Sequence, residues 1–209
     1  MASVEKYCHH EVAAQLNHNL RSIDFPSNTD IDFSLTDEKN YSLHPLRGVS
    51  DYDYYLARKD ELYCYNRSDV KTAAGWVITV PKDFPEECYR EFFETSYNFL
   101  CEKYGERNIL QSIVHGDELG ETPHMHTLFI PVVDDRKHGG EKICCNDVLN
   151  PKNLRNWHPE YAKYLKEHGV DANVHTGITR ELGGNRTVRE LKAERDKERY
   201  VTHERSRWG

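Results

Sequence analysis

Residues 109–133 read ILQSIVHGDELGETPHMHTLFIPVV, which is two apolar segments on either side of a polar turn. The segments 109–115 and 125–133 are rich in β-branched and aromatic residues, and they predict two β-strands. The short connection between them predicts an antiparallel hairpin. Pro131 has no backbone N–H to donate, so we expect an edge or an end of the second strand there.

Other segments on either side carry clear signals for secondary structure. The run GWVITV at 75–80 predicts a further strand. Residues 85–104 repeat aromatic and aliphatic side chains every three or four positions and stop before Gly105, which predicts a helix with a glycine C-cap. A second helix is expected over 150–168, with a kink or a split at Pro159.

The remaining segments give weaker signals. Residues 1–50 are polar, and we expect loops with one short helix over 12–20; a helix is expected over 52–65. A capping box at 187–190 opens a charged helix that reaches about residue 199. Together the segments predict an α+β fold with a central, mainly antiparallel β-sheet flanked by helices.

Composition limits the class of protein. The chain has 209 residues, 37% hydrophobic and 30% charged, and it lacks an apolar run long enough to span a membrane. We expect a soluble cytoplasmic protein with reduced cysteines, because no C-x-x-C pair occurs. The net charge of −7 argues against a simple nucleic-acid binder, although residues 180–209 carry nine Lys and Arg against six Asp and Glu.

Histidines gather at the ends of the two hairpin strands. His124 and His126 are two residues apart, so their side chains share one face of a strand, and the hairpin would place His115 beside them. The turn also carries Asp117, Glu118 and Glu121. Three imidazoles with a nearby carboxylate suit a divalent metal ion such as Mn, Co, Ni or Zn, and less naturally Mg.

These residues form part of a longer pattern. HGDE at 115–118 followed by TPHMH at 122–126 resembles the metal motif H-x-D-E…T-P-H-x-H of the Mob/Pre (MobV-type) plasmid mobilisation relaxases, which are HUH endonucleases. HNLR at 18–21 resembles the family's N-terminal H-N-x-R motif, and GNRTVRELK at 184–192 resembles the end of its catalytic domain. The matching segments follow the family's order over nearly the whole chain.

The resemblance implies roles at the metal site. His115, His124 and His126 would be metal ligands, and Glu118 would be the fourth ligand and part of the catalytic set. The turn is about two residues longer than the common pattern, which leaves Glu121 open as the carboxylate ligand. The implied metal is Mn or Mg, with Zn, Co or Ni as further possibilities.

The resemblance also implies roles in catalysis and DNA binding. His18 would be the nucleophile, and Arg21 would contact the scissile phosphate or orient neighbouring groups. Asn19, Arg67 and Lys71 would contact DNA. Residues 1–180 would form the catalytic HUH relaxase domain, and residues 181–209 a charged helix that ends it or begins a linker.

The implied activity is metal-dependent, site- and strand-specific DNA nicking and strand transfer at a plasmid origin of transfer. It would pass through a histidine phosphoramidate that joins the protein to the 5′ phosphate of the DNA. The expected partner is single-stranded or hairpin DNA at that origin, with no membrane involved. The chain is expected to be truncated, with a C-terminal dimerisation region missing from it.

Four alternatives stay open from the sequence. A tyrosine-type HUH replication initiator or transposase would use a tyrosine, and the candidates are Tyr7, Tyr52, Tyr54 and Tyr55. His9 and His10 are rival histidine nucleophiles. The chain could instead be a DNA-binding regulator that does not cleave. An ordinary metal hydrolase with no role on DNA would fit the acidic charge.

Overall fold

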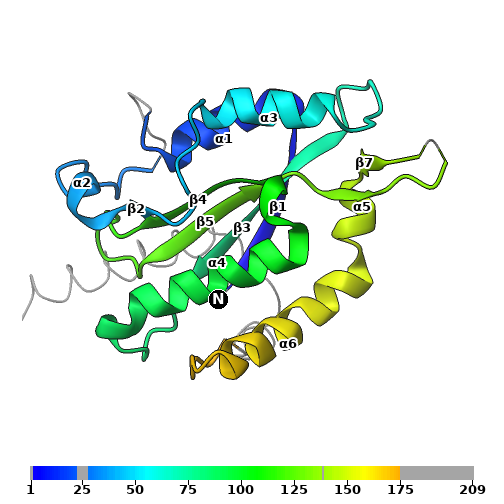
Figure 1. Cartoon of the computed structure of the whole chain (residues 1–209). Coiled ribbons are helices and arrows are strands. Elements are labelled where there is room, and N and C mark those ends of the chain that lie inside the picture. Colours follow the sequence, from blue (N-terminus) through cyan, green and yellow to red (C-terminus); the bar gives the residue numbers. More distant parts are fainter. Residues whose placement is uncertain (1, 23–27, 138, 175–209) are drawn as a thin grey trace, which may run out of the picture. The chain divides into compact units, whose positions relative to one another are not determined.

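The computed structural model describes residues 2–22, 28–137 and 139–174. Its centre is a five-stranded sheet with strand order β1-β3-β5-β4-β2, in which all neighbours are antiparallel (Figure 1). The strands are β1 (Ala2–Cys8), β2 (Tyr41–Ser42), β3 (Lys71–Thr79), β4 (Ile109–His115) and β5 (His124–Phe129). The predicted α+β class with an antiparallel sheet is confirmed.

The β4–β5 hairpin has the predicted pairing. His115 lies opposite His124, and Ile113 lies opposite His126. The second strand is shorter than predicted, because β5 ends at Phe129, two residues before Pro131. The chain then forms a separate two-stranded sheet from β6 (Val132–Asp134) and β7 (Glu141–Ile143).

One face of the sheet packs against α4 (Tyr89–Tyr104) and α6 (Pro151–Glu167), which lie below it in Figure 1. The core here is aromatic, with the Trp76 and Trp157 rings stacked 3.9 Å apart. α4 follows a 3-10 turn, η1 (Glu86–Cys88), and it ends at Gly105, as predicted; a second turn, η2 (Glu106–Asn108), leads into β4. Gly105 has φ +83°, a left-handed conformation that favours glycine.

α6 differs from the prediction at its proline. The helix begins as expected, since the Asn150 side chain accepts a hydrogen bond from the Asn153 N–H. It continues as one helix through Pro159, where a kink or a split was expected, so the split did not occur. The side chains of Trp157 and Tyr161 are buried on either side of the proline, so tertiary packing holds both halves in one helix.

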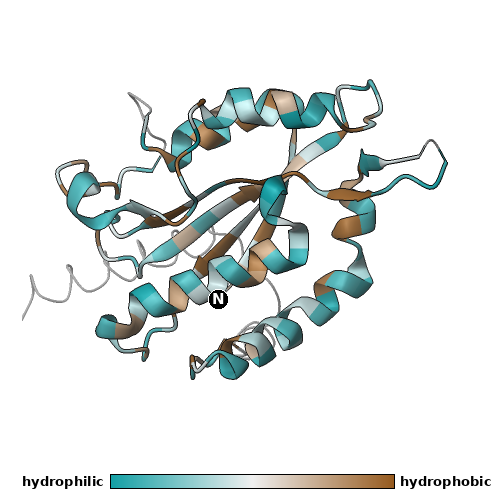
Figure 2. Cartoon of the chain, in the orientation of Figure 1, coloured by the Kyte–Doolittle hydropathy of each residue, from teal (hydrophilic) through white to brown (hydrophobic). Residues whose placement is uncertain are grey.

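The opposite face of the sheet packs against α1 (His9–Asn19) and α3 (Asp51–Asp60), which lie above it in Figure 1. Val12, Leu16 and Tyr55 meet Leu128 in this second core. The helix predicted over 52–65 is shorter in the structure, because α3 ends at Asp60. Two short helices, α2 (Thr36–Lys39) and α5 (Cys145–Val148), lie in the connections. Figure 2 shows brown hydrophobic stretches in the sheet and helices in which hydrophobic and hydrophilic residues alternate.

The sequence did not predict β1, β2 or β7, and β1 is the longest of these three strands. It pairs with β3 at an edge of the sheet, with Val4 opposite Trp76. Its sequence, ASVEKYC, is half polar because an edge strand exposes much of its surface. The helix predicted near 187–199 and the boundary near 180 lie outside the described residues. Within the described part, no helix is long and apolar enough to cross a membrane.

Candidate metal centre and nucleophile

The imidazoles of His115, His124 and His126 meet where the β4–β5 hairpin turns, and we call these three residues the triad. The ring centroids of His115 and His126 are 4.8 Å apart, those of His124 and His126 are 5.0 Å apart, and those of His115 and His124 are 5.5 Å apart. One nitrogen from each ring lies within 4.8 Å of the others. The strand register produces this convergence, because His115 and His124 are direct cross-strand partners.

The hydrogen bonding of His115 fits a metal ligand. Its Nε2–H donates to the carbonyl oxygen of Asn19 at 2.8 Å, while its buried Nδ1 has no hydrogen-bond partner in the described structure. Metal-binding histidines commonly donate one ring N–H to such an acceptor, which leaves the other nitrogen free to bind the ion. Burial, followed by the charge of Arg21, lowers the pKa of His115 to about 4, so the ring is neutral at pH 7.

The other two histidines complete a ligand set with one carboxylate. Burial lowers the pKa of His126 well below its ordinary value. The Oε1 of Glu118 lies 3.7 Å from the Nε2 of His124. Burial would raise the pKa of Glu118, but His124 and Arg21 hold it below its ordinary value. Glu121 is exposed on the same turn, so the geometry favours Glu118 as the carboxylate beside the triad.

His18, which α1 carries, also lies beside the triad. It is half-buried near the C-terminal end of α1, and its ring centroid is 6.0 Å from that of His126. Burial and then the charge of Arg21 lower the pKa of His18. The fold thus brings together two histidines that are about a hundred residues apart in sequence.

Arg21 is buried in a network of carboxylates. Its Nε and Nη2 donate to the two oxygens of Asp117 at 3.0 and 2.7 Å, and Nη2 also donates to Glu118 at 2.8 Å. Thr36 and Asn40 donate to the same Asp117 carboxylate at 2.8 and 2.7 Å. Of the two roles expected for Arg21, these bonds to Asp117 and Glu118 favour the orienting one.

Asp117 and the Asn19 carbonyl are the contributors that sequence reasoning missed. Burial would raise the pKa of Asp117, but hydrogen bonds from Arg21, Thr36 and Asn40 lower it to about 2. Its place beside Glu118 in the turn was the available signal. No sequence signal marks a backbone carbonyl as the acceptor for His115.

The residues expected to bind DNA do not share one location. The Asn19 side chain is buried and accepts a hydrogen bond from Gln15. Lys71 begins β3 and pairs with Glu11, whereas the other end of β3 lies opposite His124. Arg67 is exposed and pairs with Asp69. At about 3.3 Å per residue, Lys71 is roughly 25 Å along the strand from the triad.

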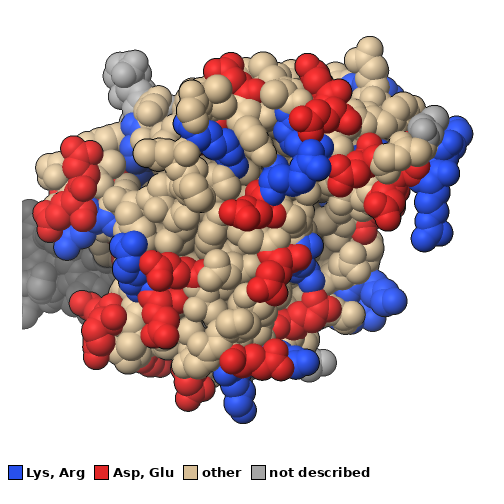
Figure 3. Space-filling view, in the orientation of Figure 1, with Lys and Arg blue, Asp and Glu red and all other residues tan. Residues whose placement is uncertain are grey.

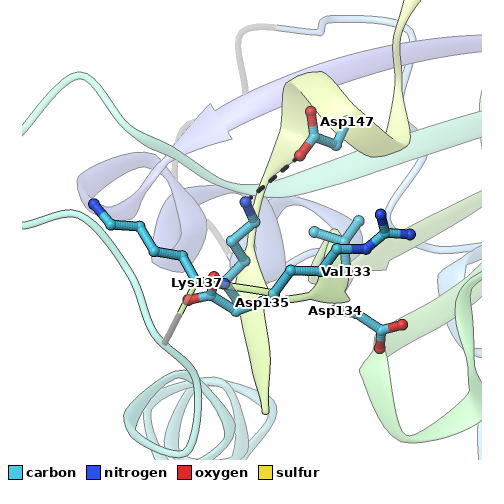
Figure 4. Close-up of a pocket in the computed structure, with 7 residues that line it drawn as sticks. Val133, Asp134, Asp135, Lys137 and Asp147 are labelled. Atoms are coloured by element: carbon cyan, nitrogen blue, oxygen red, sulfur yellow. Dashed lines mark hydrogen bonds and ion pairs between the residues drawn. The ribbon is translucent and has the colours of Figure 1, made fainter. Parts of the chain in front are cut away.

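Two cavities also lie at this far end. One, of about 420 Å³, is lined by residues that include His9, Tyr65 and Arg67. The other, of about 440 Å³, lies beside the β6–β7 hairpin, where Lys142 is 3.8 Å from Asp147 (Figure 4). Figure 3 shows charges of both signs interspersed over the face in view, so that face carries no continuous basic surface.

The rival nucleophiles have other partners. Tyr55 is buried, and its hydroxyl contacts His9 and Thr72, with a pKa raised by burial to about 12. The Tyr54 hydroxyl donates to the Arg107 carbonyl. Tyr52 packs against Tyr55 in the α3 core.

Tyr7 comes nearest to the triad, since it lines a small cavity together with His126. Its hydroxyl donates to Glu5, and burial followed by the charge of Glu5 raises its pKa. His9 and His10 open α1, at the end opposite to His18. Of all these candidates, His18 is the one placed beside the triad.

Comparison with known proteins identifies the family. The family model described as "Plasmid recombination enzyme" (Mob_Pre) matches residues 1–193. The chain belongs to this family. It is 33% identical over 196 residues to a plasmid recombination enzyme of Lactiplantibacillus plantarum, covering 90% of this chain and 52% of that protein. It is 28% identical to a plasmid recombination enzyme of Streptococcus agalactiae, covering 92% of this chain and 38% of that protein. The chain spans about half or less of these relatives' length.

Solved structures show the same fold. The Mn-bound MobM relaxase domain, in complex with plasmid pMV158 oriT DNA at pH 6.8, is 30% identical, with a TM-score of 0.75 over 93% of this chain and 97% of that chain. The same domain in Mn-bound form at pH 4.6 matches with a TM-score of 0.71 and 29% identity. The resemblance to MobV-type relaxases that was read from the motifs is confirmed at the level of family and fold.

Proposed function

We propose that this chain is the DNA-nicking domain of a plasmid mobilisation relaxase, acting site- and strand-specifically at an origin of transfer. The proposal rests on the position of His18. Its partly exposed imidazole lies beside the triad, with its ring centroid 6.0 Å from that of His126. MobM, which shares the fold, binds oriT DNA in its Mn-bound form, and this supports the same substrate class here.

His18 would attack the scissile phosphate. Nucleophilic attack requires a neutral imidazole, and the lowered pKa of His18 provides one at pH 7. Attack forms a bond from the imidazole nitrogen to phosphorus and breaks the bond from phosphorus to the 3′ oxygen, which takes a proton from water. The products are a 5′ phosphoramidate on His18 and a free 3′ hydroxyl. Because the phosphoryl group stays bound to the protein, the reverse reaction can rejoin or transfer the strand.

The triad and Glu118 would hold a divalent ion beside the same phosphate. The ligand set fits Mn, with Mg, Zn, Co or Ni as alternatives, because imidazole and carboxylate ligands accept several of these ions. A bound ion supplies Lewis-acid stabilisation of the charge that develops on the phosphate oxygens. Arg21 is a positioning residue in this scheme, since its ion pair with Asp117 fixes the chain three residues after His18.

We place the catalytic domain at residues 1–180 and a charged end or linker at 181–209. Arg67 and Lys71 would contact DNA away from the nick, at the far end of β3. Plasmid DNA as substrate implies that the protein works in the cytoplasm.

A plasmid-relaxation assay tests the proposal. Supercoiled plasmids carrying the pMV158 oriT, or the origin beside this chain's own gene, are incubated with protein and Mn²⁺. The wild type should give relaxed DNA with protein attached, and His18→Ala should give none. His10→Ala, on the same helix, is the matched control and should retain activity. Wild-type binding without relaxation of either plasmid would instead support a non-cleaving DNA-binding regulator.

A further inference from the structure

We infer that Gln15 is a positioning residue of the metal centre, and that it fixes the orientation of the His126 ring through one water molecule. Gln15 lies on α1, three residues before the proposed nucleophile His18. The inference rests on the proposed function, because it requires the triad to hold the metal ion. It adds to the site a polar partner that lies outside every motif of the sequence.

Two of the three imidazoles have a backbone acceptor. The His115 Nε2–H donates to the Asn19 carbonyl at 2.8 Å, and the His124 Nδ1–H donates to the Thr122 carbonyl at 3.2 Å. His126 makes no hydrogen bond to any residue that the structure describes. A histidine that binds a metal ion usually donates its other ring N–H to an acceptor, which fixes its tautomer and its orientation. His126 therefore needs an acceptor of another kind.

A small cavity beside His126 provides a place for that acceptor. Its volume is about 10 Å³, which is room for about one water molecule. The wall consists of His126 and other residues of β1, β3 and β5 on one side, and of Gln15 and Asn19 of α1 on the other. The cavity thus separates the metal ligand from two carboxamide side chains.

The hydroxyl and indole groups of the cavity wall have partners elsewhere. They form hydrogen bonds from Tyr7 to Glu5, from Trp76 to Tyr104, and between Thr127 and Ser112. The two carboxamides are the polar side chains that remain for a water molecule beside His126.

The hydrogen bond between the carboxamides selects Gln15 as the acceptor. The Gln15 Nε2–H donates to the Asn19 Oδ1 at 2.9 Å, so the Asn19 oxygen is already engaged. A carboxamide that donates with its nitrogen keeps an oxygen that can accept. A water molecule in the cavity would accept the N–H of His126 and donate to the Gln15 Oε1. Two hydrogen bonds then orient the His126 ring toward the ion.

Two measurements on Gln15→Leu test this role, since leucine fills similar space without a polar group. The Kd for Mn²⁺, measured by calorimetry, should rise about tenfold, as is usual when a metal ligand loses such a partner. In the metal-free protein, ¹H–¹⁵N NMR of the imidazoles should show one His126 tautomer in the wild type and a mixture in Gln15→Leu. Gln15→Glu keeps an acceptor oxygen and should retain both the wild-type Kd and the single tautomer.

Asn17→Leu is the matched control. Asn17 is also on α1, but it is exposed and does not line the cavity. The same change of amide to leucine should therefore leave the Kd for Mn²⁺ and the His126 tautomer as in the wild type.

A Kd of Gln15→Leu within threefold of the wild-type value would overturn the inference and leave the proposed function intact. An equal loss of affinity in Gln15→Glu would also overturn it, because the acceptor oxygen would then be irrelevant. A lowered melting temperature of metal-free Gln15→Leu with an unchanged His126 tautomer would show that Gln15 only packs α1. A wild type that binds no Mn²⁺ would contradict both this inference and the proposed function.

Discussion

At the scale of single residues, His124 offers the cleanest test of the metal centre. Its side chain is one of the three candidate ligands, and it is only partly buried, so its removal should leave the core intact. His124→Ala should reduce Mn²⁺ bound per chain from about one to near zero, because two imidazoles hold the ion poorly. Metal analysis after dialysis, with circular dichroism to confirm folding, measures this. Unchanged metal content would place the site elsewhere.

The burial of His115 and His126 predicts an unusual pH dependence of metal binding. Protons compete with the metal for ligand nitrogens, and three ordinary imidazoles would weaken binding about a thousandfold between pH 7 and pH 5.5. Because the pKa of His115 is about 4 and that of His126 is also lowered, the expected loss is about tenfold or less. Calorimetric titration with Mn²⁺ at the two pH values decides between these outcomes. Loss near a thousandfold would mean that the ligands titrate as exposed histidines.

Asp117 should be a large contributor to stability. Its carboxylate is buried and accepts hydrogen bonds from three side chains, of which Arg21 is charged. Asp117→Asn leaves the buried guanidinium without its main partner, and we expect the free energy of unfolding to fall by about 3 kcal/mol. Asp69→Asn removes an exposed pair with Arg67 and should cost less than about 1 kcal/mol. If urea denaturation shows the same loss of unfolding free energy for Asp117→Asn and Asp69→Asn, the buried Asp117 network does not stabilise the fold more than an exposed ion pair does.

At the scale of secondary structure, the proline of α6 gives a prediction. Pro159 cannot donate the helical hydrogen bond to the carbonyl four residues earlier, and it is exposed. Pro159→Ala restores that donor without removing a buried contact. We expect the free energy of unfolding to rise by about 1–2 kcal/mol, since the more flexible unfolded chain offsets part of the gain. A lower melting temperature would show that the proline is required for the packing of α6.

The sequence predicted the elements whose signals are local. β4, the start of β5, α4 with its glycine end, and the start of α6 follow from short patterns of apolar residues and caps. β1 was missed because an edge strand alternates with polar residues such as Glu5 and Lys6, which give no continuous apolar run. The unbroken α6 was missed because burial of Trp157 and Tyr161 overrides the local effect of Pro159.

At the scale of the whole molecule, the site depends on one face of the sheet. The face that carries His124 and His126 also packs against α1, so the helix that bears His18 is held against the metal centre. The histidine triad follows from the hairpin and was predictable. The position of His18 follows from the packing of α1 across the sheet, and only the family motif pointed to it in the sequence. The contacts of Asp117 with segment 36–40 had no sequence signal.

In the proposed reaction, His18 becomes covalently joined to the 5′ phosphate of nicked DNA. Peptide mapping by mass spectrometry tests it most directly, using protein trapped on a single-stranded origin oligonucleotide in Mn²⁺. The adduct should lie on His18, and acid should release it, as for a phosphoramidate. An acid-stable adduct on a tyrosine, such as Tyr7 in the cavity that His126 also lines, would rule out His18 as the nucleophile and indicate a tyrosine-type HUH enzyme.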